Sequence, residues 1–188
     1  MGRVIVIEFI TLDGMIQDPD GSGGTASGGW AFRHGPETVA GDKFQLGASL
    51  DTGVMLLGRL TWELFAGIWP GRDNGFAQKM NAIDKLVASR GAPDVSEWVN
   101  SSVMCSPLAS SVRQQRAHRD VVVAGSVSVV HELIDNDLVD EFRLLVFPDV
   151  LGGGRRLFPE GRTLALSTTR TAAVGAAVLT RYERVRST

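Results

Sequence analysis

The stretch LLGRLTWELF, residues 56–65, decides the class of fold that we expect for this chain. Its apolar run ends on Gly58, and we expect a helix to begin at Arg59, directly after the glycine. A strand that passes through a glycine into a helix leaves free backbone N–H groups at the helix start, where an anion can bind. The stretch therefore predicts one strand–helix unit of an α/β sheet. The turn is either a phosphate site, with Leu60 and Thr61 beside the arginine, or an ordinary turn with a surface arginine.

Strand and helix patterns alternate on both sides of this unit. Short apolar runs predict strands at residues 4–10, 54–57, 86–89, 103–105, 121–124 and 141–147. Helices are expected at residues 36–50, 59–65, 108–117 and 127–134. The alternation predicts a three-layer α/β fold in which helices cover both faces of a mainly parallel central sheet. Strand-like runs at residues 164–171 and 176–185, joined near Gly175, predict a closing antiparallel hairpin.

Composition limits the organisation and the partners of the chain. With 188 residues, 44% of them hydrophobic, we expect a single domain over residues 1–188. A formal net charge of −2, with both signs scattered, predicts a small-molecule partner and no nucleic acid or membrane. The only cysteine is Cys105, residues 1–9 are too short and too charged for a signal peptide, and no apolar run reaches transmembrane length. These features predict a cytoplasmic protein. The three histidines show no metal-ligand spacing, so we expect no metal site.

Two further junctions resemble the one at Gly58. Residues Val123-Ala124-Gly125-Ser126 end the clearest strand and open a helix at Val127. Residues Val87-Ala88-Ser89-Arg90 place a hydroxyl and a guanidinium at another strand end. Ligands of open α/β sheets bind at the carboxyl ends of the strands, so three such ends on one edge suggest an extended phosphorylated ligand. A dinucleotide fits this pattern.

Several motifs in order carry a family resemblance. They are Thr11-Leu12-Asp13-Gly14-Met15-Ile16, Gly58-Arg59-Leu60-Thr61-Trp62-Glu63, residues 85–89, Ala124-Gly125-Ser126, and residues 138–144 leading to Leu151-Gly152-Gly153-Gly154. From Val4 to about Tyr182 the chain resembles the dihydrofolate reductase superfamily. Within it, the chain is similar to the group that holds the reductase domain of bacterial riboflavin biosynthesis and many small relatives.

The resemblance implies hydride transfer from NADPH to a small heterocyclic or carbonyl compound. It implies that Arg59 faces the adenosine 2′-phosphate side of the cofactor. The residues that would hold NADPH are Gly58, Arg59, Leu60, Thr61, Ser89, Arg90, Ala124, Gly125, Ser126 and Val127. Two alternatives stay open: a pyrimidine reductase that acts on a riboflavin precursor of the 5-amino-6-(ribosylamino)uracil type, and a dinucleotide-binding module without turnover.

The resemblance also suggests an acid and a substrate pocket. Dihydrofolate reductases carry an acidic residue on the first helix, sixteen positions before the motif glycine, and this spacing leads to Asp42. A carboxylate early on a helix can equally be a surface residue that favours the helix dipole. Asp13, Trp30 and Leu46 are candidates for the substrate pocket, although a tryptophan in the long loop of residues 13–35 could instead pack on the core. Family analogy predicts a homodimer.

Overall fold

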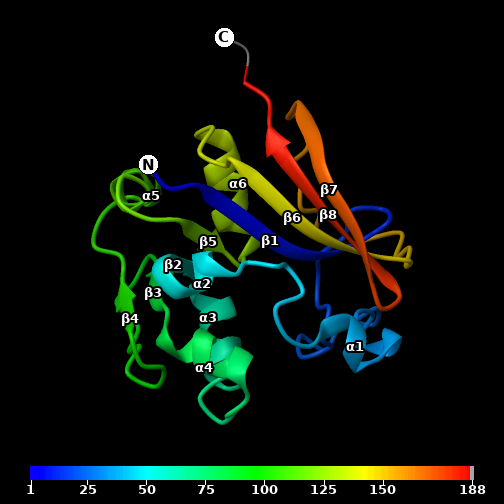
Figure 1. Ribbon diagram of the computed structural model, residues 1–188, viewed down its shortest axis with the longest axis horizontal. Coiled ribbons are helices and arrows are strands. Elements are labelled where there is room, and N and C mark those ends of the chain that lie inside the picture. The colour runs from blue at the N-terminus through cyan, green and yellow to red at the C-terminus, as the bar shows by residue number, and fades with distance from the viewer. Residues whose placement is uncertain (187–188) are drawn as a thin grey trace. The chain divides into compact units, whose positions relative to one another are not determined.

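The computed structural model describes residues 1–186 and divides into two compact units (Figure 1). The first unit comprises Met1–Val6 and Leu46–Asp140, and the second comprises Ile7–Gln45 and residues 141–186. Strand β1 (Val4–Thr11) is continuous, and it gives its first three residues to the first unit and the rest to the second. No helix within residues 1–186 is both long enough and apolar enough to cross a membrane.

The first unit contains a parallel sheet in the order β4-β3-β2-β5-β1. Its other strands are β2 (Val54–Gly58), β3 (Asp84–Ala88), β4 (Ser101–Val103) and β5 (Val121–Val123). Every pairing among them is parallel. All residues of β2 and β5 are buried, because helices cover both faces of the sheet and leave no polar side for alternation.

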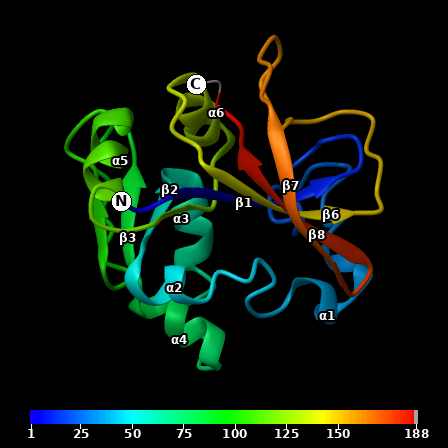
Figure 2. The same cartoon turned by 45° about the horizontal axis from the view of Figure 1, so that its top comes forward.

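Helices form the two outer layers of this unit (Figure 2). They are α2 (Ala48–Thr52), α3 (Arg59–Ala66), α4 (Gly75–Ala82), α5 (Leu108–Arg116) and α6 (Val127–Asp135). Helix α2 packs on α4, and α5 packs on α6, as expected when right-handed crossovers run in opposite directions from the middle of a sheet. The predicted three-layer fold is confirmed.

The second unit is built on antiparallel strands. Strand β8 (Ala177–Arg184) pairs with both β6 (Glu141–Phe147) and β7 (Leu166–Val174). The predicted C-terminal hairpin is confirmed, with Gly175 at its tip in the left-handed region (φ +56°). The core cluster of the second unit consists of Trp30, Ala31, Leu145, Phe147, Ala177 and Leu179. Two short helices, η1 (Phe32–His34) and α1 (Pro36–Val39), complete the unit.

The helix expected at residues 36–50 is wrong. Helix α1 ends at Val39, residues 40–47 form turns, and α2 starts only at Ala48. Gly41 and Gly47 have φ values of +74° and +53°, which a right-handed helix cannot contain. Two smaller differences lie nearby: helix α4, which starts after the N-cap Asn74, was not predicted, and β4 lies two residues before the expected strand.

Candidate functional site

The two strongest glycine junctions meet at one edge of the first unit. Strands β2 and β5 are neighbours, and the Gly58 N–H donates to the Gly125 carbonyl oxygen at 3.0 Å. Gly125 has φ +88°, and the peptide bond from Gly125 to Ser126 is cis. A Cβ atom on Gly58 would lie 2.4 Å from Ser126 Oγ, so any larger residue at the end of β2 would force Ser126 or the strand to move. The close approach of the two turns thus depends on both glycines.

Two helices begin at this contact. Helix α3 starts at Arg59, next to Gly58, and α6 starts at Val127, next to Ser126. Within residues 1–186, neither N-cap residue forms a side-chain capping bond. The first-turn N–H groups and the positive dipole ends of both helices are therefore offered at the same sheet edge, which suits a phosphate group. Ser128, which the sequence did not single out, adds a hydroxyl 3.0 Å from Ser126 Oγ.

The side chains in the first turn of α3, those of Arg59, Leu60 and Thr61, differ in their contacts. Arg59 Nη1 lies 2.6 Å from Glu63 Oε1, and both side chains are nearly half exposed. An exposed pair of this kind contributes little stability, so the guanidinium can exchange its partner for a ligand anion at small cost. Leu60 points outward, with 64% of its surface exposed, and Thr61 is half-buried.

The third junction is one strand further along the same edge. Strand β3 runs parallel to β2 and pairs Ala88 with Gly58, so Ser89 and Arg90 follow at the carboxyl end of the neighbouring strand. Ser89 Oγ accepts a hydrogen bond from the Gly91 N–H at 3.2 Å, and Arg90 is exposed. The structure therefore brings all ten residues expected to hold a dinucleotide to one edge of the first unit.

Asp42 lies in the second unit, in a turn and not on a helix. The Gln45 N–H donates to the Asp42 carbonyl oxygen at 3.0 Å, and Gln45 itself has φ +52°. Phe44, two residues after Asp42, stacks its ring on that of Phe9 with 5.5 Å between the ring centroids. Leu46 is buried in the first unit, and neither Asp42 nor Leu46 lies in a helix.

Asp13 and Trp30 both have structural partners in the second unit. The Asp13 carboxylate accepts bonds from Thr11 Oγ1 at 2.5 Å and from the Gly152 N–H at 2.8 Å. These two bonds, that of the Thr11 hydroxyl first, lower the pKa of Asp13. Trp30 is fully buried in the core cluster, and its Nε1–H donates to the Gln17 carbonyl oxygen at 2.8 Å.

Two ionisable features of the second unit were not predicted from the sequence. Burial raises the pKa of the Glu8 carboxyl to about 8. The feature of the sequence that could have identified Glu8 is a glutamate inside an otherwise apolar strand. His34 Nε2 lies 2.5 Å from Asp149 Oδ2, a pair separated by 115 positions in the chain and joined only by the fold. A carboxyl with a strongly raised pKa, such as that of Glu8, often marks a functional site.

Comparison with known proteins settles the family. The model of the RibD C-terminal domain matches residues 3–180. The chain belongs to that family. RibD C-terminal domains are reductases, which places the chain among the oxidoreductases. The uncharacterized protein YyaP of Bacillus subtilis (strain 168) is 26% identical over 184 residues, which cover 92% of this chain and 90% of YyaP.

Solved structures agree with this RibD-type fold. The structure of a protein from Shewanella sp. PV-4 that is assigned to riboflavin biosynthesis superposes on this chain with a TM-score of 0.74 and 21% sequence identity. The superposition covers 99% of this chain and 100% of the Shewanella chain. Dihydrofolate reductase from Enterococcus faecalis, solved with NADP(H), has a TM-score of 0.53 and 17% identity, with 97% and 96% covered. The expected resemblance to the dihydrofolate reductase superfamily is confirmed.

Proposed function

We propose that the chain is an NADPH-dependent reductase that transfers a hydride to a small heterocyclic or carbonyl substrate. The observation that carries this proposal is the contact of Gly58 with the Gly125 turn, at which helices α3 and α6 both begin. A turn of small residues, flanked by two helix starts, has the electrostatics for a pyrophosphate. Membership of a reductase family supports the same assignment.

The residues at this edge fit NADPH. The backbone around Gly58, Gly125 and Val127 would hold the pyrophosphate, since in the described part of the chain no side chain of the N-cap residues caps the first N–H groups of α3 and α6. Arg59 and Arg90 would hold the 2′-phosphate, because a guanidinium and a phosphate form charge-assisted hydrogen bonds. When bound, the nicotinamide would supply the hydride, and the work of the chain is to hold it and exclude water.

Reduction of a C=N or C=O bond also needs a proton. We propose Asp42 as the acid, on the strength of the family resemblance and of its half-buried position in a defined turn. Family membership also favours a narrower candidate function, reduction of a ribosylaminopyrimidine. A module that binds the dinucleotide without turnover is the remaining candidate, because binding needs only the residues of the first unit.

Oxidation of NADPH, followed by absorbance against a panel of ribosylaminopyrimidines, dihydropterins and small carbonyl compounds, tests the proposal. Turnover that falls about a hundred- to ten-thousandfold in Asp42→Asn, with unchanged NADPH affinity, is expected for an acid at the site. Turnover restricted to the aminopyrimidines would select the narrower function. NADPH binding with no turnover on any compound would favour the binding module, and no NADPH binding would refute all three.

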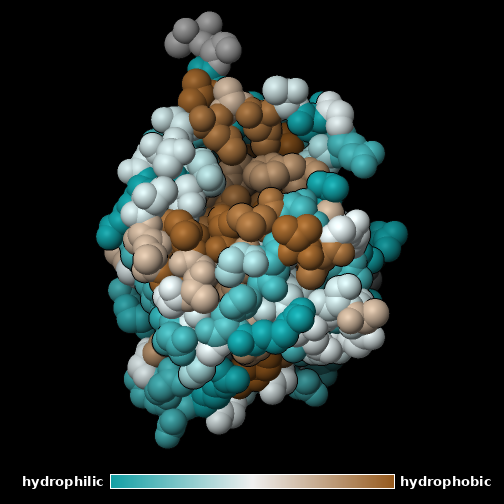
Figure 3. All heavy atoms as spheres, turned by 90° about the vertical axis from the view of Figure 1, so that its right-hand side faces the viewer, coloured by the Kyte–Doolittle hydropathy of each residue, from teal (hydrophilic) through white to brown (hydrophobic). Residues whose placement is uncertain are grey.

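We also propose that the protein forms a homodimer through the second unit. Figure 3 shows apolar residues gathered on the face that carries the C-terminal hairpin. Large apolar side chains of this unit are strongly exposed, among them Leu12 (66%), Val150 (70%) and Val178 (44%). Exposed apolar surface that is contiguous usually marks an interface. Light scattering should give twice the chain mass of 20.2 kDa, and Val178→Asp should lower it. A mass near 20.2 kDa at all concentrations would contradict the dimer.

A further inference from the structure

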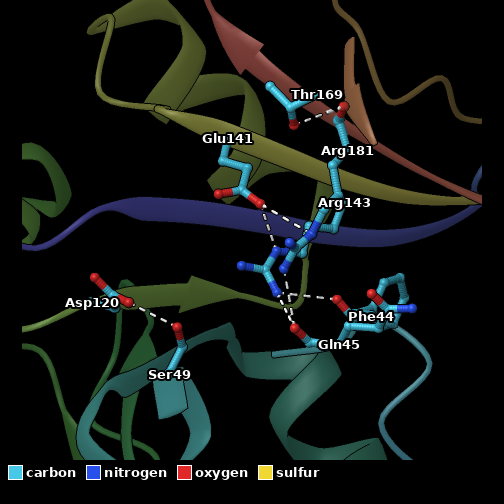
Figure 4. Close-up of polar contacts among 8 residues, drawn as sticks. All are labelled: Phe44, Gln45, Ser49, Asp120, Glu141, Arg143, Thr169 and Arg181. Atoms are coloured by element: carbon cyan, nitrogen blue, oxygen red, sulfur yellow. Dashed lines mark hydrogen bonds and ion pairs between the residues drawn. The ribbon is translucent and has the colours of Figure 1, made fainter. Parts of the chain in front are cut away.

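A buried ionic cluster of Glu141, Arg143 and Arg181 in the second unit contacts the backbone of Phe44 and Gln45 (Figure 4). Strands β6 and β8 place Arg143 directly opposite Arg181. Glu141 Oε1 accepts from Arg143 Nε at 2.6 Å and lies 3.6 Å from Arg181 Nε. The side chains of Glu141 and Arg143 are only 3% and 7% exposed. The carboxylate between the two guanidinium groups allows like charges to face each other across the strands.

Both arginines donate to backbone carbonyls of one short segment. Arg143 Nη1 donates to the carbonyl oxygens of Phe44, at 3.1 Å, and Gln45. Arg181 Nη2 donates to the Gln45 carbonyl oxygen at 3.1 Å. The segment is thus fixed by three charge-assisted hydrogen bonds, and the ring of Phe44 is fixed separately by its stacking on Phe9.

The segment that these bonds hold has an unfavourable backbone. Gln45 adopts φ +52°, a left-handed conformation that is uncommon for residues other than glycine. Residues 41–45 form a tight turn, in which the Lys43 N–H donates to Gly41 O at 2.9 Å and the Gln45 N–H donates to Asp42 O at 3.0 Å. Such a conformation persists only where its surroundings determine it, and here the surroundings are the two guanidinium groups.

Stability alone does not explain the cluster. Buried ion pairs are often no better for stability than apolar residues of similar volume, because desolvation offsets the Coulomb attraction. Their specific effect is on geometry, since a planar guanidinium fixes two acceptors at once. The acceptors here belong to the two residues that end the turn begun by Asp42. A shift of about 1 Å in a reacting group can cost a hundredfold in rate, so this turn needs to be rigid if Asp42 is the acid.

We propose that Arg143 is a positioning residue for the reduction: through the carbonyls of Phe44 and Gln45 it fixes the turn that carries Asp42, and with it the direction of the Asp42 carboxyl. This inference rests on the proposed function. Arg143 does not touch the substrate or the cofactor in this role. Its loss therefore acts on the rate only through Asp42, and it leaves the phosphate site of the first unit unchanged.

The test compares Arg143→Met with a matched control, Arg184→Met. Arg184 is the last residue of β8, and its guanidinium also donates to backbone carbonyls, those of Ala165 and Val185, but not to the turn. In Arg143→Met the Gln45 amide should exchange its hydrogen at least about tenfold faster, because its bond to Asp42 O is released. NADPH affinity by calorimetry should stay within about twofold of the wild type. Arg184→Met should change neither quantity.

Turnover in a double-variant cycle distinguishes positioning from general destabilisation. Arg143→Met should lower kcat about tenfold or more in the wild-type background and have almost no effect in Asp42→Asn, because both changes remove the same group from the reaction. Equal losses in both backgrounds, or an unchanged exchange rate at Gln45, would overturn the inference. If Arg143→Met does not fold, Arg143→Lys replaces it, since lysine keeps the charge but lacks the separate Nε and Nη1 donors that join Glu141 to the two carbonyls. Wild-type protein that binds no NADPH would instead refute the proposed function, while hydrogen exchange would still report whether Arg143 holds the turn.

Discussion

Replacement of Gly58 by alanine is the sharpest perturbation of the contact between β2 and β5. The added Cβ would lie 2.4 Å from Ser126 Oγ, 2.9 Å from Ser126 Cβ and 3.1 Å from Ser126 N. The hydroxyl can rotate away, but Cβ and N are fixed to the backbone, so the end of β2 must move by several tenths of an ångström. Overpacking of this kind costs about 1–3 kcal/mol. For a chain of this size, 2 kcal/mol lowers the melting temperature by about 4–8 °C.

The same shift should weaken cofactor binding, because the starts of α3 and α6 would separate. We expect Gly58→Ala to raise the NADPH dissociation constant at least about tenfold, which corresponds to 1.4 kcal/mol. Adding Ser126→Gly removes the two closest atoms and should restore part of both losses. Gly75→Ala is the control, since none of the described atoms lies within 4 Å of its added Cβ. Thermal unfolding and calorimetry measure the two effects. A Gly58→Ala variant with wild-type melting temperature and affinity would refute the reasoning.

Three further predictions concern ionisation and the core. The raised pKa of Glu8, about 8, means that the folded chain keeps a proton that the unfolded chain loses above about 4.5. Wild-type stability should therefore fall from pH 5 to pH 8.5 relative to Glu8→Gln, by roughly 3 kcal/mol in urea unfolding, and parallel pH curves would contradict this. Desolvation lowers the pKa of Lys85 to about 8, so the folded chain binds fewer protons than the unfolded chain above that pH. Stability should rise between pH 8 and pH 10 in the wild type but not in Lys85→Met, and an identical rise in both would argue against it. Trp30→Ala should destabilise the second unit by about 3–5 kcal/mol, read by unfolding, with NADPH affinity unchanged, and a stability within 1 kcal/mol of the wild type would place the ring outside the core.

Much of the first unit could be predicted from the sequence, because local patterns determine it. The buried runs of β2 and β5 are short, apolar and bounded by glycine, and each leads directly into a helix. Parallel strands bring their carboxyl ends to one edge, so Gly58 and Gly125 could be expected near each other without knowledge of the register. Their contact at 3.0 Å required the strand order, which the sequence does not state.

The second unit was harder to predict because its key contacts join distant residues. Helical propensity over residues 36–50 was misleading, since Gly41 and Gly47 break the helix by their positive φ angles. The hydrogen bond from Arg143 to the Gln45 carbonyl oxygen joins residues that are 98 positions apart in the chain, so it depends on tertiary structure alone. The sequence left open whether Trp30 lines a pocket or packs on the core, and the structure places its indole in the core cluster.

Calorimetric titration of the wild-type protein with NADPH and with NADH tests the central claim most directly. In the proposed function, the edge formed by Gly58, Gly125 and the flanking arginines binds a dinucleotide and contacts its 2′-phosphate. NADPH should bind about ten- to a hundredfold more tightly than NADH, as expected for one charge-assisted contact worth about 1.5–3 kcal/mol, and Arg59→Ala should remove most of that difference. Equal affinities for the two cofactors, or an Arg59→Ala variant that keeps the full preference, would contradict it.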